Sequence, residues 1–197
     1  MGVRWLAVAA MTTAALAQCG SELSSELKIS YREMSTRAAA NRIQSSSNQT
    51  AIEVDTYIHV IHNGTTKDEG YLSSEQLDKQ MAVLNEVFGR HSIQFNLLET
   101  EYIENEKWAH GDPDGRLEMQ TLRKGSYGDL NLYFLKSMGG QVTGECTFPL
   151  EYATFPDPNA ILERDGCLTV SSTVNGGSDP AKHDGLTAVH EVGHWFG

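Results

Sequence analysis

The sequence has no apolar run approaching the ~20 residues that a membrane-spanning helix needs, so we expect no membrane span. Basic residues are also few: 15 Lys and Arg stand against 26 Asp and Glu, a net charge of −11. This balance argues against a general nucleic-acid binder, which should carry a basic face, and against docking on an anionic membrane. Of the 197 residues, 40% are hydrophobic and 21% are charged, close to ordinary globular usage. We expect a monomer with one sizeable domain.

The N-terminus has the order of parts that is typical of a secretory signal peptide. A short basic start precedes an apolar, alanine-rich stretch, which ends in the A-x-A cleavage sequence at 15–17. Residues 1–17 are therefore predicted to be a signal peptide, and the protein to be secreted and extracellular. A buried hydrophobic helix fits the position and flanks less well. A lipid anchor on Cys19 is disfavoured because Gln18 is too large for the position before such a cysteine.

The next segment, residues 18–50, is polar and rich in Ser, Ala and Glu, and it ends in a linker-like run of small polar residues. We interpret it as a pro-segment or flexible N-terminal arm and place the main domain at 51–197. The tripeptides that begin at Asn48 and Asn63 are glycosylation sequons, a weak signal by themselves.

Cysteine is scarce, with three residues in the whole sequence. In an exported protein an odd number of cysteines leaves one thiol over. Cys146 and Cys167 lie in the same half of the sequence, and we predict a disulfide between them. Cys19 then has its partner outside this sequence or acts as a thiol ligand in the pro-segment.

Residues 51–197 alternate between strand and helix patterns, which predicts an α/β fold. Ser73 is predicted to start a helix, with Gln76 completing a capping box, and the helix should end near Gly89–Arg90. The other predicted elements are strands at 54–60, 93–97, 129–135 and 167–171, an edge strand within 141–148, and a short helix that follows the turn at 112–115 and ends at Leu122.

The last eight residues read H-E-x-x-H-x-x-G, a pattern that arises by chance in fewer than roughly 2 of 100 chains of this composition. On a helix that starts near Asp184–Gly185, His190 and His194 lie one turn apart on one face and can bind one Zn²⁺. Glu191 lies beside the first ligand, where it can act as general base on metal-activated water. The less specific alternative is an amphipathic helix with two satisfied histidines.

Gly197 can end this helix and turn the chain towards a third zinc ligand. In the longer pattern H-E-x-x-H-x-x-G-x-x-H, that histidine lies three residues after the glycine, and this sequence stops at the glycine. We consider three explanations. The sequence is a fragment of a longer protein, or it is a catalytically deficient homologue, or the third ligand comes from elsewhere. The last is the least favoured, with His59, His62 and His183 as its candidates.

The segments 55–60 (DTYIHV), 81–88 (MAVLNEVF), 122–134 (LRKGSYGDLNLYF) and 187–197 (TAVHEVGHWFG), together with 70–72 (GYL), resemble secreted fungal extracellular metalloproteases. These belong to the pappalysin-like branch of the metzincins, peptidase family M43. The resemblance implies a twisted mixed sheet, a backing helix and an active-site helix, zinc as cofactor, and hydrolysis of peptide bonds. It carries over His190 and His194 as ligands and Glu191 as base, and it leaves the C-terminal subdomain and third ligand outside this sequence.

We therefore expect a zinc endopeptidase acting on proteins or peptides, with substrate along the edge strand at 141–148. The alternative is a catalytically deficient homologue with a peptide-binding role at most.

The acidic residues Glu99, Glu101, Glu104 and Glu106 match no calcium loop and predict a solvated charged face.

Overall fold

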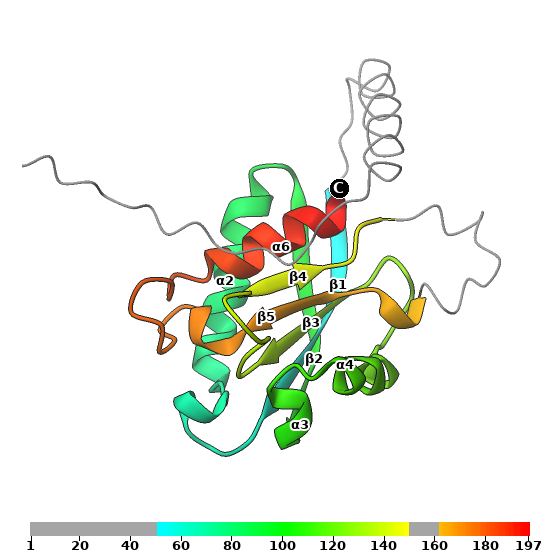
Figure 1. The fold of residues 1–197 in the computed structure, drawn as a ribbon. Helices are drawn as coiled ribbons and strands as arrows, with labels where there is room; N and C mark the ends of the chain where they lie inside the picture. Colours follow the sequence, from blue (N-terminus) through cyan, green and yellow to red (C-terminus); the bar gives the residue numbers. More distant parts are fainter. Residues whose placement is uncertain (1–50, 150–161) are drawn as a thin grey trace, which may run out of the picture.

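The computed structural model describes residues 51–149 and 162–197. Its centre is a five-stranded sheet with the strand order β2-β1-β3-β5-β4 (Figure 1). β1 pairs in parallel with β2 and β3, β3 pairs in parallel with β5, and β4 is an antiparallel edge strand. The predicted mixed α/β architecture is confirmed. The strands are β1 (Ile52–His62), β2 (Ile93–Glu104), β3 (Leu130–Leu135), β4 (Gly144–Cys146) and β5 (Cys167–Val170).

Helices cover both faces of the sheet (Figure 1). On one face, α2 (Ser74–Gly89) and α6 (Leu186–Phe196) share a buried core with β1, β3 and the β4–β5 pair. On the other face, the short helices α3 (Glu106–Ala109) and α4 (Pro113–Met119) cover a second, smaller cluster around Tyr133 and Leu135. Single 3-10 turns lie at η1 (Lys67–Glu69), η2 (Gln120–Leu122) and η4 (Ser171–Thr173). β3 is the central strand of the sheet, and all six of its residues are buried.

Local sequence signals account for several element boundaries. The Ser73 hydroxyl accepts from the Gln76 N–H, and the Gln76 Oε1 accepts from the Ser73 N–H. The predicted capping box therefore starts α2. Asn105 caps α3 with a single bond, in which its Oδ1 accepts the N–H of Trp108. Asp112 accepts the N–H groups of Asp114 and Gly115 at the start of α4.

The two edge strands, β2 and β4, differ most from the pattern in the sequence. β2 continues to Glu104 because its whole length pairs with β1, so three of the four acidic residues lie on a strand and only Glu106 starts α3. Glu99, Glu104 and Glu106 are exposed as predicted, whereas Glu101 is half-buried and accepts from His59 and Lys124. β4 is shorter than expected and is limited to three residues.

The predicted signal peptide, the predicted pro-segment, Cys19 and Asn48 lie outside the described residues. Within the two described ranges, no helix is both long and apolar enough to cross a membrane.

Candidate active site

Helix α6 carries the H-E-x-x-H motif, and its start is held by contacts with two other elements, α2 and η4, and by Asp184. Gly185 is the N-cap with a φ of 79°, a left-handed conformation that favours glycine. Its carbonyl accepts from the side chain of Gln80 in α2, and its N–H donates to Thr173 in η4. Asp184 accepts the N–H of Leu186. Along the helix, Val192 and other small or apolar side chains are buried against the sheet and orient the motif.

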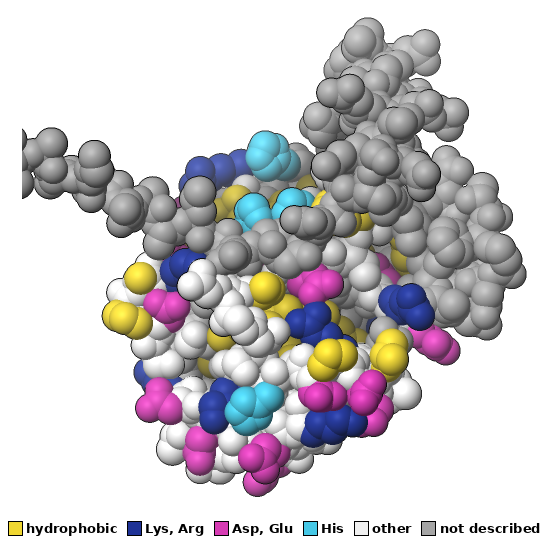
Figure 2. Space-filling view, in the orientation of Figure 1, with side chains coloured by type: hydrophobic (Ala, Val, Ile, Leu, Met, Phe, Trp, Pro, Cys, Tyr) yellow, Lys and Arg dark blue, Asp and Glu magenta, His cyan; other side chains and the backbone are white. Residues whose placement is uncertain are grey.

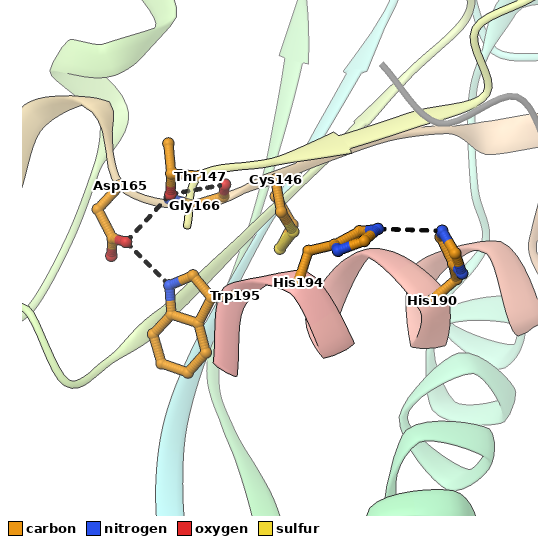
Figure 3. The surroundings of a disulfide bond; sticks show 8 residues. Cys146, Thr147, Asp165, Gly166, His190, His194 and Trp195 are labelled. Atoms are coloured by element: carbon orange, nitrogen blue, oxygen red, sulfur yellow. Dashed lines mark hydrogen bonds between the residues drawn. A yellow bond between two sulfur atoms is a disulfide. The ribbon is translucent and has the colours of Figure 1, made fainter. Parts of the chain in front are cut away.

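His190 and His194 converge on the opposite, accessible side of α6 (Figure 3). Their Nε2 atoms lie 3.1 Å apart, and the ring planes are perpendicular with centroids 4.7 Å apart. Phe148, just after β4, packs edge-on against His194 at 5.1 Å. Burial, with a smaller effect from His190, lowers the pKa of His194 below its ordinary value of 6.5. His194 is therefore neutral at pH 7, which is the form that binds a metal.

The donor geometry of this pair fits zinc. Two nitrogens at ~2.0–2.1 Å from one tetrahedral ion lie roughly 3.3–3.4 Å from each other, close to the observed separation. Among the described residues, no group of three or more His, Cys, Asp and Glu could hold a metal. The separation of the two Nε2 atoms is thus compatible with a shared metal ion, and no further residue of the described ranges joins the pair in a metal-binding group.

The other histidines considered as third ligands have different surroundings. His59 is completely buried, with its ring nitrogens 3.0 Å from Glu101 Oε2 and Asn131 Oδ1, so it is a satisfied core residue. Burial lowers its pKa. His62 packs edge-on against Tyr71, and His183 is bonded through Nδ1 to the carbonyl of Asp179. None of the three joins the His190–His194 pair in a metal-binding group.

Glu191 lies on the adjacent face of the same helix, directed at β4, and is fully buried. The space into which it projects is bounded by β4, whose Gly144 lies against its carboxylate. The motif therefore places two accessible imidazoles and one buried carboxylate on adjacent faces of one helix.

Cys146 of β4 and Cys167 of β5 are directly opposite in the antiparallel pair and form a disulfide. Both are buried in the core, and Figure 3 shows Cys146 between β4 and the motif helix α6. The disulfide thus ties the edge strand to the parallel part of the sheet, close to the motif helix.

A buried carboxylate that the sequence pattern did not indicate connects the motif helix α6 to the segment that follows β4. Asp165 Oδ1 accepts from Trp195 Nε1 at 2.9 Å and from the Thr147 hydroxyl at 3.2 Å (Figure 3). Its Oδ2 forms an ion pair with Arg123 at 2.9 Å, and both side chains are 4% exposed. Burial raises the pKa of Asp165, against the opposing effects of Arg123 and the two hydrogen bonds. Because its partners lie 18 to 42 residues away, no local spacing marks Asp165.

A cavity of about 270 Å³ lies on the opposite face of the β4–β5 pair and contains none of the motif residues. Arg116 and Glu145 form a 2.6 Å ion pair at this cavity. Over the α3 and α4 side of the molecule, acidic and basic side chains are interspersed (Figure 2). This face therefore offers no patch of a single charge sign.

An H-E-x-x-H helix packed on a mixed α/β sheet is characteristic of metalloproteases, a class of hydrolases. No family model matches the chain. It is nevertheless 41% identical to an extracellular metalloprotease of Pyricularia oryzae over 201 residues, which cover 97% of this chain and 68% of that protein. It is 41% identical to one of Uncinocarpus reesii (91% of this chain, 64% of that protein) and 47% identical to one of Colletotrichum graminicola (74% and 50%). The chain belongs to this family of fungal extracellular metalloproteases and spans between half and about two thirds of these relatives.

Proposed function

We propose that the chain is the zinc-binding part of a secreted endopeptidase of the metzincin type, in the pappalysin-like family M43. The observation that carries this proposal is the convergence of two imidazole Nε2 atoms, 3.1 Å apart, on the helix that also holds Glu191. His190 and His194 would hold the zinc ion together with a ligand outside the described residues. When bound, zinc supplies a Lewis acid that polarises the peptide carbonyl and activates water.

In this proposal Glu191 is the general base and then the general acid. Its carboxylate accepts a proton from the attacking water and then donates it to the leaving amine nitrogen, so the water is divided between the two products. Burial between α6 and β4 restricts the carboxylate to one region beside His190. General base and metal ligands thus share one rigid helix, which keeps their relative positions constant.

The substrate main chain is proposed to pair with β4. Val170 donates to Thr143 O, and Thr147 donates to Gly166 O, so the main-chain groups of residues 143, 145 and 147 face β5. The intervening residues Gly144 and Cys146 direct their N–H and C=O groups to the outer edge of the sheet. A peptide can add there as a further strand, with its main chain beside the motif helix.

The test uses the full-length protein recovered from a secreting host. We expect one equivalent of zinc, hydrolysis of casein, and a large loss of zinc affinity in His190→Ala and His194→Ala. Glu191→Gln should retain zinc and lose hydrolysis. Hydrolysis that survives Glu191→Gln would contradict the role of Glu191, and unchanged zinc affinity in both histidine variants would contradict the metal site.

The second candidate is a catalytically deficient secreted homologue that holds peptides along β4. The observation behind it is the outer edge of β4, with which no strand pairs among the described residues and which a peptide could occupy without a complete metal site. A folded protein that binds peptides and hydrolyses none, in wild-type form and with zinc added, would support it.

Secretion and the N-terminal boundaries are also part of the proposal. N-terminal sequencing of the secreted protein should give Gln18 for the form that keeps the pro-segment and a residue near Ala51 for the processed form. An N-terminus at Met1 in the secreted protein would contradict the proposed signal peptide.

A further inference from the structure

Gly144 of the edge strand β4 packs closely against Glu191 of the motif helix α6. A Cβ atom built on Gly144 would lie 2.5 Å from Glu191 Cγ, 2.6 Å from Oε1 and 2.7 Å from Cδ. Carbon atoms in contact lie about 3.5–4.0 Å apart, so no methyl group fits in this space. Gly144 is not among the residues with a positive φ, and its backbone conformation is therefore open to other residues. The absence of a side chain is required by the close packing of β4 on Glu191.

The main chain of the same residue faces the outer edge of the sheet. Gly144 lies opposite Thr169, between residues whose main-chain groups are directed at β5. In an antiparallel ladder such a residue points its N–H and C=O away from its partner strand. Within the described residues no strand pairs with this edge of β4. Gly144 thus presents its main chain to an added strand and its α-carbon to Glu191.

We propose that Gly144 is a positioning residue that sets the Glu191 carboxylate in register with a peptide bound along β4. This inference rests on the proposed function and adds a residue to it. Glu191, the proposed base, packs against the same segment of β4 with which the substrate would pair. A displacement of Glu191 by a side chain at 144 would therefore change the position of the base relative to the substrate. His190 and His194 lie on an adjacent face of α6 and are not among the atoms nearest the added Cβ, so they stay in place.

The disulfide supports this arrangement from two residues away. β4 has three residues, which is little for an edge strand to remain paired by hydrogen bonds alone. Cys146, on the same face of the strand as Gly144, is bonded to Cys167 in β5. The covalent link limits how far β4 can move away from Glu191 when a methyl group is added at position 144.

The first arm of the test is a double-mutant cycle on thermal unfolding of the full-length, zinc-saturated protein, and it is independent of peptidase activity. Gly144→Ala should lower the unfolding temperature by about 3 °C or more through overpacking. In a Glu191→Ala background the decrease should be less than half as large, because the three atoms that the methyl group would strike are gone. Gly89→Ala, where no atom lies within 4 Å of the added Cβ, is the matched control and should not lower the temperature. An equal decrease in both backgrounds overturns the proposal.

The second arm measures hydrolysis of a peptide substrate. Gly144→Ala should reduce kcat roughly tenfold or more, because the base is displaced, with KM within about threefold and zinc affinity unchanged. A kcat equal to that of Gly89→Ala overturns the proposal even if the thermal cycle shows coupling. If the wild-type protein hydrolyses nothing, the proposed function fails, and the thermal cycle then decides by itself whether Gly144 sets the position of Glu191.

Discussion

Replacing Asp165 by Asn should be among the most destabilising single substitutions in this domain. Asp165 is the counter-ion of Arg123, and both side chains are 4% exposed. Asn is nearly isosteric with Asp, so the substitution removes the charge and leaves the packing almost unchanged. The amide also places a donor where an acceptor is needed. If its oxygen faces Arg123, its NH₂ group meets the donors of Trp195 and Thr147, and if it is flipped, the NH₂ group meets Arg123.

The expected magnitude follows from the burial of Arg123. Leaving one member of a buried ion pair without its partner costs about 3–5 kcal/mol. For a domain of this size, each kcal/mol shifts the unfolding temperature by about 2–4 °C, so a decrease of about 6–20 °C is expected. Urea denaturation followed by far-UV circular dichroism measures the free energy of unfolding without relying on Trp195 fluorescence.

The control is the double substitution Arg123→Met with Asp165→Leu, which removes both charges. It should cost less than Asp165→Asn, because no buried charge remains without a partner. A loss below about 1 kcal/mol for Asp165→Asn, or a larger loss for the double variant, would refute the argument that Arg123 depends on Asp165 for compensation.

Three further predictions concern other parts of the domain. Ser73→Ala removes the cap of α2 and should cost about 1 kcal/mol in urea denaturation; no change would mean that the capping box contributes nothing here. Replacing Cys146 and Cys167 together by Ser opens a link across 21 residues and should cost about 3 kcal/mol, and an unchanged midpoint would contradict this. Burial lowers the pKa of His59 below 6.5, so the unfolded chain takes up a proton that the folded protein excludes. Stability should therefore fall as the pH drops below about 6.5, and His59→Gln should flatten that decrease; equal slopes for the two proteins would be inconsistent with this role.

Much of the fold was predictable because its signals are local. The alternation of apolar residues around Ile58 indicated β1, and the Ser73–Gln76 pair indicated the start of α2. The lengths of β2 and β4 were less predictable, because pairing partners determine where a strand ends. β2 extends to Glu104 because β1 is long, and β4 is limited to the three residues that pair with β5.

The candidate site also has features that the local sequence predicts and features that it does not. The i, i+4 spacing of His190 and His194 is a property of one helix, so the sequence alone indicated that both imidazoles share a face. The environments of these residues depend on distant segments. Gly144 lies 47 positions before Glu191 along the chain, and only the packing of β4 on α6 shows why no side chain fits at that position.

The motif, its helix and the α/β order of elements follow from the amino-acid sequence, because each depends on residues within a few turns of one another. The tertiary structure alone decided which groups are buried and paired. It made His59 a core residue bonded to Glu101 and Asn131, and it joined Asp165 to Arg123 and Trp195. Burial and partner choice are set by contacts between segments far apart in the chain, and a local pattern carries no information about which of those contacts will form.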